Sequence, residues 1–194
     1  MGKTLLLRGR PGVGKTTLIR RVAEALGARA GGFFTEELRG PGGRKGFRLV
    51  TLDGQEAVMA HVTLRGGGRP QVGRYGVDVG AIERVGVPAL RRAVAAGQIV
   101  VIDEIGKMEL FCGPFKDAVL QAVSGPCAVL ATVMAMPNPW VDSLKAMPLV
   151  TVWEVTEGNR ERLVKEVLDW LGEGPLIRPS VAAAQPPPPR RSRG

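Results

Sequence analysis

The sequence predicts an α/β fold built on a mostly parallel β-sheet. Short runs of β-branched residues alternate with longer amphipathic stretches along most of the chain, which is the pattern of strands joined by helices. Residues 99–102 form a continuous apolar run, as expected for a central parallel strand that is buried on both faces. A glycine-rich turn separates the first extended run from the first amphipathic stretch, so both elements can be placed from the start of the chain.

The first strand and the first helix are the best-defined elements. The strand is expected at residues 4–7, and the helix after the glycine-rich turn covers Lys15–Leu26. Apolar residues recur at helical spacing within this range. Gly27 follows directly, and glycine is a common helix stop.

Residues 31–78 follow a different pattern. Short extended runs are interrupted there by a Gly-Pro-Gly-Gly turn and by Asp53-Gly54, and an Asp-Gly pair between extended runs is a strong hairpin signal. The extended runs cover residues 33–35, 47–52 and 58–62. We therefore expect an antiparallel insertion at one edge of the sheet.

The alternation of strands and helices resumes at residue 79 and completes a single domain, residues 1–172. Helices are expected at 87–96, 114–123, 141–146 and 159–171, and strands at 99–102, 128–133 and 150–155. Residues 173–194 are rich in proline and arginine and lack the apolar residues that a core needs. They are predicted to form a disordered tail.

Composition narrows the functional classes. The 194 residues carry 27 basic and 18 acidic side chains, a net charge of +9, and the last seventeen residues hold four arginines and no acid. This balance permits nucleic-acid binding, but there is no RNP-like aromatic motif and no Cys/His finger spacing. No apolar run reaches the roughly 18 residues of a membrane span, no secretory signal is visible, and two cysteines do not suggest a disulfide framework. We expect a soluble, cytoplasmic protein that does not act on membranes.

The strongest motif lies between the first strand and the first helix. The segment matches the phosphate-binding pattern G-x-x-x-x-G-K-[ST] in full and in the right context. Its glycines let backbone N–H groups turn inward around phosphate oxygens, and the start of the helix adds a favourable dipole. The predicted nucleotide-binding residues are Gly9, Arg10, Pro11, Gly12, Val13, Gly14, Lys15, Thr16 and Thr17.

Three residues of this loop receive specific roles. Lys15 is expected to neutralise the β- and γ-phosphates and to act in catalysis. The hydroxyl of Thr16 is expected to coordinate Mg²⁺. Thr17 is placed to reach the α-phosphate.

A pair of acids, Asp103 and Glu104, ends the predicted strand at residues 99–102. The carboxyl end of a buried parallel strand lies at the crevice where such sheets bind ligands. Asp103 is therefore expected to hold Mg²⁺. Glu104 projects differently and is expected to orient and deprotonate a water for attack on the γ-phosphorus. An acid pair here favours hydrolysis, although a nucleotide kinase can use an acid in the same place.

Weaker candidates follow, each with an ordinary alternative. Thr132 ends the next predicted strand and is either a sensor of the γ-phosphate or a plain strand threonine. Lys107 either adds positive charge in the transition state, as a third catalytic residue, or is a surface lysine. Arg39, Arg44 and Arg74 are candidates for an arginine finger, and each also fits an ordinary surface charge.

The remaining special residues are assigned structural roles. His61 is the single histidine and cannot build a histidine-rich metal site alone. Cys112 and Cys127 lack C-x-x-C spacing and are interpreted as buried or free thiols. The three tryptophans are expected in the core or at an interface.

Taken together, these motifs resemble those of the small P-loop nucleoside-triphosphatase family of thermophilic prokaryotes, called cancer-related nucleoside-triphosphatase in vertebrates. The matching strings include Thr35-Glu36-Glu37, Gly73-Arg74-Tyr75-Gly76-Val77 and Asp103-Glu104-Ile105-Gly106-Lys107-Met108-Glu109-Leu110, besides the phosphate loop. The resemblance spans about residues 3–172. It implies a RecA-like P-loop fold and Mg²⁺-dependent hydrolysis of nucleoside triphosphates, ATP and GTP among them, with loose base preference. It also implies that Glu36, Glu37 and Arg74 lie near the nucleotide.

The sequence thus favours a Mg²⁺-dependent nucleoside-triphosphate phosphohydrolase that releases a nucleoside diphosphate and phosphate. Two alternatives stay open. A nucleotide or nucleoside kinase would need a second pocket for the phosphoryl acceptor, and residues 31–78 are the segment that would form it. An RNA-associated P-loop protein would use the basic tail to bind phosphate backbones.

Overall fold

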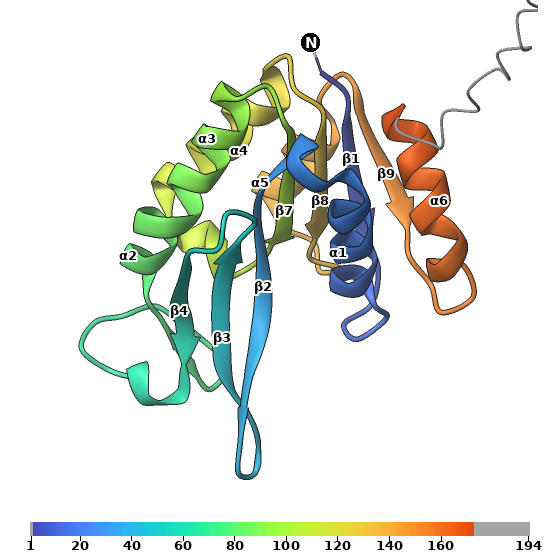
Figure 1. Ribbon diagram of the computed structural model, residues 1–194. Coiled ribbons are helices and arrows are strands. Elements are labelled where there is room, and N and C mark those ends of the chain that lie inside the picture. Colours follow the sequence, from blue (N-terminus) through green and yellow to red (C-terminus); the bar gives the residue numbers. More distant parts are fainter. Residues whose placement is uncertain (1, 173–194) are drawn as a thin grey trace, which may run out of the picture.

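A computed structural model of the protein describes residues 2–172, and these residues form a nine-stranded sheet covered by helices (Figure 1). The strands are β1 (Thr4–Arg8), β2 (Ala30–Gly40), β3 (Gly43–Thr51), β4 (Glu56–His61), β5 (Gln71–Val72), β6 (Tyr75–Val77), β7 (Ile99–Ile105), β8 (Val129–Val133) and β9 (Val150–Glu154). The helices are α1 (Lys15–Leu26), α2 (Val79–Ala81), α3 (Val87–Ala95), α4 (Gly113–Ser124), α5 (Pro139–Lys145) and α6 (Arg160–Leu171). The sheet order is β5-β6-β4-β3-β2-β7-β8-β1-β9.

The half of the sheet from β2 to β9 is parallel, as predicted. β1 lies between β8 and β9, and β7 lies between β2 and β8, all with the same direction. The carboxyl ends of these strands therefore meet along one edge, where parallel sheets bind ligands. The phosphate loop after β1 and the acids at the end of β7 are brought to this edge.

Two apolar cores cover the two faces of the parallel half. Leu5 and Leu7 point into one core with the apolar faces of α1 and α6, whereas Leu6 points into the other with α3 and α4. All three leucines are fully buried. This alternation follows from the strand period of two, because successive side chains leave opposite faces. The helices fix the first strand on both sides and so fix the loop that follows it.

The antiparallel half contains β3, β4, β5 and β6 and forms one edge of the sheet, as expected for the insertion. It is not a separate module, however. β2 begins at Ala30 and pairs in parallel with β7 over residues 30–33. It then continues as the first strand of an antiparallel hairpin with β3. A Cβ atom on Gly32 would lie 2.0 Å from the Val101 carbonyl oxygen, so a glycine is required where the strand enters the sheet. The short strands β5 and β6 were not predicted.

The helical segment before β7 is longer than predicted. The helix expected at 87–96 is α3, but helical turns start at Val79 and reach it through a π-helical segment, Ile82–Gly86. Pro88 lacks a backbone N–H donor and so cannot continue an ordinary α-helical ladder. The turn before it takes the π-helical form instead. Three strands are also longer than predicted: β2 and β3 extend the runs expected at 33–35 and 47–52, and β7 continues past residue 102 to Ile105. The remaining helices and strands lie within two residues of their predicted bounds.

The residues that were assigned structural roles are buried or make structural contacts. Cys112 and Cys127 are buried free thiols. His61 caps a short turn by accepting a hydrogen bond from the Thr63 amide. Trp153 and Trp170 pack edge to face at 6.3 Å between ring centroids. Among residues 2–172, no helix is long and apolar enough to cross a membrane. The predicted tail, 173–194, lies outside the described residues.

Candidate active site

The phosphate loop joins β1 to α1 with the backbone geometry that its glycines allow. Gly12 and Gly14 have φ values of 80° and 102°, in the left-handed region that favours glycine. Lys15, the first residue of α1, folds back over the loop, and its ammonium donates to the carbonyl oxygens of Gly9 at 2.9 Å and Arg10 at 3.3 Å. The ammonium is nearly enclosed by the loop. These carbonyl groups hold a buried cation where a phosphate chain would bind.

Asp103 lies on β7 and is almost fully buried. Its carboxylate accepts a hydrogen bond from the hydroxyl of Thr132 on β8 at 2.6 Å and a longer one from Thr35 on β2 at 3.5 Å. Burial raises the pKa of Asp103, and hydrogen bonds from Thr132 and Thr16 oppose that rise. The Thr132 hydroxyl therefore fixes the carboxylate of Asp103, the candidate metal ligand, by donating a hydrogen bond to it. The sequence left Thr132 as either a γ-phosphate sensor or an ordinary strand threonine, and did not predict its contact with Asp103.

Glu104 is partly buried and lines two neighbouring cavities. Burial raises its pKa, the positive charge of Lys15 lowers it, and the negative charge of Asp103 raises it further. The sequence predicted that the two acids would project differently, and the structure shows this. Asp103 points into the buried hydrogen-bond network, whereas the carboxyl of Glu104 faces open space.

A third acid, Glu109, was missed by the sequence reasoning. It is buried in a short turn after β7, and its carboxyl accepts a hydrogen bond from the Gly106 amide at 3.2 Å. Burial raises the pKa of Glu109 to about 8, and the charges of Glu104 and Asp103 add to that rise. A Cβ atom on Gly106 would lie 3.0 Å from a Glu109 oxygen and 3.2 Å from a Glu104 oxygen. Glycine at 106 thus lets the two carboxyl groups flank one point.

The larger of the two cavities, here called the phosphate cavity, has a volume of about 650 Å³. Its wall combines residues of the phosphate loop, of α1, of the β2–β3 hairpin and of β7. These include Gly12, Lys15, Thr16, Thr17, Arg20, Glu36, Glu37, Arg44 and Glu104. The structure therefore brings most of the predicted binding residues into one space. Gly9, Arg10 and Val13 lie on the loop but outside this wall, and Gly9 lines the second cavity instead.

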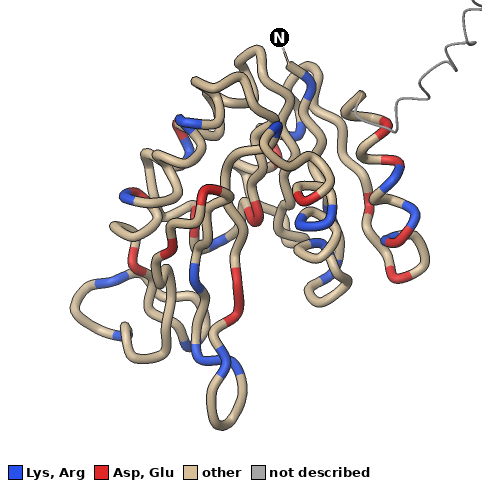
Figure 2. The backbone as a smooth tube through the Cα atoms, viewed as in Figure 1, with Lys and Arg blue, Asp and Glu red and all other residues tan. Residues whose placement is uncertain are grey.

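The hairpin wall of the phosphate cavity carries opposite charges in alternation. Glu36 lies between Arg20 at 2.7 Å and Arg48 at 2.6 Å, and the hydrogen bond from Arg20 is the largest cause that lowers its pKa. Glu37 pairs with Arg44 and Arg39; burial raises its pKa, but the hydrogen bonds of these two arginines outweigh burial and lower it. Figure 2 shows basic residues gathered toward the end of this hairpin.

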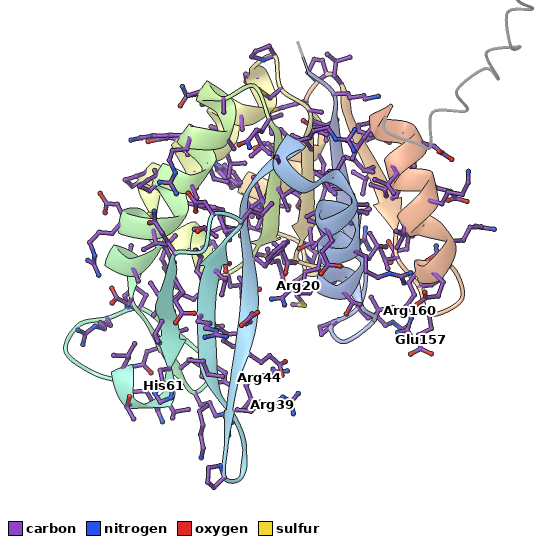
Figure 3. The ribbon with its side chains drawn as sticks, viewed as in Figure 1. Arg20, Arg39, Arg44, His61, Glu157 and Arg160 are labelled. Atoms are coloured by element: carbon purple, nitrogen blue, oxygen red, sulfur yellow. The ribbon has the colours of Figure 1, made fainter. Side chains whose placement is uncertain are left out.

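The three candidate arginine fingers occupy different places. Arg44 lines the phosphate cavity, whereas Arg39 and Arg74 do not. Arg74 donates to the Arg44 carbonyl and its guanidinium lies 5.4 Å from the Tyr75 ring centroid, so it braces the hairpin. Arg20 was missed, because a single arginine on the exposed side of a predicted helix has no distinguishing pattern. Figure 3 shows Arg20, Arg39 and Arg44 on the same side of the molecule.

Two further basic residues, Lys107 and Arg160, border the site. Lys107 is exposed and lines the second cavity together with Glu104, Gly106 and Glu109. On the other side of the loop, Arg160 at the start of α6 donates to the Val13 carbonyl at 3.2 Å and borders a small hollow of about 190 Å³ with Thr17 and Arg21. No functional role was assigned to Arg160 from the sequence, although Asn159-Arg160 is one of the segments that match the family, so its contact with the loop appears only in the fold.

Comparison with known proteins gives a consistent result. A family model described as NTPase matches residues 4–168. The nucleoside-triphosphatase THEP1 of Thermotoga petrophila is 42% identical over 164 residues, which cover 84% of this chain and 90% of that protein. The crystal structure of THEP1 from Aquifex aeolicus is similar with a TM-score of 0.78 and 36% identity, covering 87% of this chain and 98% of that chain. The solution structure of a human cancer-related nucleoside triphosphatase is similar with a TM-score of 0.71 and 35% identity, covering 88% of this chain and 97% of that chain.

The parallel sheet with a phosphate loop after β1 is that of a P-loop NTPase. The chain belongs to the NTPase family, whose relatives here are named nucleoside-triphosphatases. The resemblance stated from the sequence motifs is thereby confirmed.

Proposed function

We propose that this protein is a Mg²⁺-dependent nucleoside-triphosphate phosphohydrolase that converts a nucleoside triphosphate and water into a nucleoside diphosphate and phosphate. One observation carries the proposal. The phosphate loop, the ammonium of Lys15 and the carboxyl of Glu104 line the same cavity. A phosphate-binding loop, a cation and a candidate base in one space are the parts that phosphoryl transfer to water needs.

The loop would bind the triphosphate mainly through backbone groups. The amides that follow Gly12 and Gly14 face the phosphate oxygens, and α1 adds its positive dipole end. Lys15 would exchange the carbonyl oxygens of Gly9 and Arg10 for the β- and γ-phosphates. Phosphate oxygens carry full negative charge, so they are stronger acceptors than carbonyl groups.

The donor set fits Mg²⁺. The hydroxyl of Thr16 and the carboxylate of Asp103 are hard oxygen donors of the kind that this ion prefers. Burial raises the pKa of Asp103, and a cation bound beside the carboxylate would favour its ionised form. No group of three His, Cys, Asp or Glu that could hold a metal is found within residues 2–172, so the other ligands would be water and phosphate oxygens. When bound, Mg²⁺ neutralises negative charge on the β- and γ-phosphates.

Glu104 would orient the attacking water and accept its proton. Its raised pKa brings it closer to the pH at which a general base works best, while the nearby charge of Lys15 favours the ionised form that a base requires. Lys107 is the further cation that would stabilise the charge developing on the γ-phosphoryl group.

We propose broad base specificity, because the loop contacts phosphates rather than the base. The hollow beside the loop is bordered by Arg21, Arg160 and Glu161, which are long and flexible. We also propose a cytoplasmic location, which the two buried free thiols support.

Phosphate release from ATP, GTP, CTP and UTP, with Mg²⁺ and with EDTA, tests this proposal. Glu104→Gln is expected to bind nucleotide normally and to lose turnover by about 10²-fold or more, within the range for a general base. Glu83→Gln is the matched control, because Glu83 is exposed and lines neither cavity. It should retain full turnover. Normal turnover by Glu104→Gln would remove Glu104 as the base, and full turnover in EDTA would remove the metal requirement.

A further inference from the structure

The second cavity beside Glu104, here called the apolar cavity, has a volume of about 360 Å³. It shares Pro11, Lys15, Thr35, Phe47 and Glu104 with the phosphate cavity, so the two spaces adjoin at the candidate base. The remainder of its wall comes from the antiparallel half and from the loops after β7 and β8. Much of that wall is formed by Met59, Val72, Met108, Met134, Ala135 and Met136.

Hydrolysis alone does not require such a cavity. An attacking water occupies about 30 Å³, less than a tenth of the available volume. Protein interiors are normally packed without large voids, and ligand sites are typically concave and mostly apolar, with a few polar groups placed at one end. Methionine side chains are flexible and adapt to the shape of a bound molecule.

The polar groups of the apolar cavity are concentrated near the phosphate cavity. Lys15, Thr35 and Glu104 line both cavities, and Glu109 lies beside Glu104. Lys107 is the other charged residue of the wall, and the rest is formed mainly by methionines, Phe47, Val72 and Ala135. Glu104 lines both cavities, whereas Glu109 lines the apolar cavity alone, so Glu104 is the carboxyl placed to accept a proton from a ligand that faces the phosphate cavity. In the described part of the chain this wall contains no Asn, Gln, Asp, Ser or Arg that would recognise a base or a ribose.

We propose that the apolar cavity binds a small molecule with a hydroxyl group on a largely apolar body, and that this hydroxyl accepts the γ-phosphoryl group in place of water. This inference rests on the proposed function, since it uses the same triphosphate and the same base. The acceptor oxygen forms a bond to the γ-phosphorus, and the bond from the γ-phosphorus to the β–γ bridging oxygen breaks. The hydroxyl proton passes to Glu104. The products are a nucleoside diphosphate and a phosphate monoester.

The test uses the full chain, Mg²⁺, ATP labelled at the γ-phosphate, and 2-phenylethanol as the acceptor probe. Labelled 2-phenylethyl phosphate and labelled inorganic phosphate are separated and counted. Glycerol at the same concentration is the control, because it has hydroxyl groups but no apolar body. The account predicts about tenfold or more ester from 2-phenylethanol than from glycerol, because only the former gains from burial in an apolar site.

A variant that fills the cavity sharpens the test. Ala135→Phe adds a ring at the cavity wall without altering the phosphate loop or the acids, so ester formation should fall about tenfold while phosphate release stays within about twofold. Ala95→Phe is the matched control, on an exposed position of α3 that lines neither cavity. Val72→Trp fills the cavity from another side and serves if Ala135→Phe does not fold.

The outcomes separate this inference from the hydrolase proposal. Phosphate release without alcohol tests only the hydrolase proposal. If phosphate is released but 2-phenylethanol yields no more ester than glycerol, the acceptor site is overturned and the hydrolase remains. If ester forms equally well in Ala135→Phe and Val72→Trp, the alcohol reacts without entering the apolar cavity, which also overturns the inference.

Discussion

The parallel and antiparallel halves of the sheet treat the same type of side chain in opposite ways. In the parallel half, Asp103, Glu104 and Glu109 are buried, and burial raises the pKa of each. In the antiparallel half, arginines contact Glu36 and Glu37, and both acids have a lowered pKa. The surroundings of a carboxyl group, rather than its identity, decide its charge behaviour.

This difference suggests a division of labour. The acids of the parallel half are not paired with arginines, so a bound cation would offset their negative charge under the proposed function. The acids of the hairpin, in contrast, are paired with Arg39, Arg44 and Arg48 of the hairpin itself and with Arg20 of α1. We therefore expect the parallel half to bind and react, and the hairpin to shape the cavity.

The largest expected effect concerns nucleotide binding. Lys15→Ala should weaken the binding of Mg²⁺–ATP by about 10³-fold, because it removes a nearly enclosed cation from the phosphate site. Arg44→Ala, its counterpart on the hairpin, should weaken binding by less than about tenfold, because this arginine is already paired with Glu37. Titration with a fluorescent ATP analogue measures both. An equal loss of Mg²⁺–ATP affinity in the two variants would contradict the proposed division of labour between the parallel half and the hairpin.

The next effect concerns stability and sharpens the contrast between buried and paired acids. Glu109 has a pKa of about 8 in the folded protein against an ordinary value of 4.5. As pH rises from 4.5 to about 8, the unfolded chain loses this proton and the folded protein keeps it, so the free energy of unfolding falls across that window.

Glu109→Gln removes this dependence while preserving an oxygen that accepts from Gly106. Relative to the variant, the wild type should lose about 2 kcal/mol or more between pH 5 and pH 8, since one pKa unit corresponds to about 1.4 kcal/mol. Urea unfolding at several pH values measures the difference. Parallel curves for the two proteins would mean that Glu109 ionises in the fold as it does in water.

The smallest effect is expected on the hairpin. Glu36→Gln should cost about 1 kcal/mol at pH 7, the upper range for partly exposed ion pairs. Because the pKa of Glu36 is lowered, this contribution is present above pH 4.5 and is lost as pH falls through the folded-state pKa. Glu56→Gln is the control: Glu56 contacts the same Arg48 but is 58% exposed, so it should cost less. Unfolding curves that show a larger loss for Glu56→Gln would contradict this ordering.

The two halves also differ in how far local sequence determines them. The bounds of α1 match the prediction, because the loop motif, the apolar spacing and Gly27 all lie within one short segment. The entry of β2 into the parallel sheet was missed, since Gly31 and Gly32 have low strand propensity. Gly32 is required by the close approach of Val101 on β7, and Gly31 by that of Ala93 and Gln98. β5 and β6 are too short to give a periodic pattern.

The candidate site shows the same limit. The motifs located the phosphate loop and the acid pair because both lie at the carboxyl end of a strand of the parallel sheet, the loop after β1 and the acids within the last residues of β7. The burial of Glu109 and the contacts of Arg20 with Glu36 and of Arg160 with Val13 depend on segments far apart in the chain. No single stretch of sequence contains that information, so these contacts appear only once the sheet order is known.

A crystal structure with Mg²⁺ and a non-hydrolysable ATP analogue tests the central claim most directly. The account predicts the β- and γ-phosphates against Gly12, Gly14 and Lys15, with an ordered water between the Glu104 carboxyl and the γ-phosphorus. A triphosphate bound elsewhere, or a Glu104 carboxyl turned away from the γ-phosphorus while another group holds the water, would contradict it.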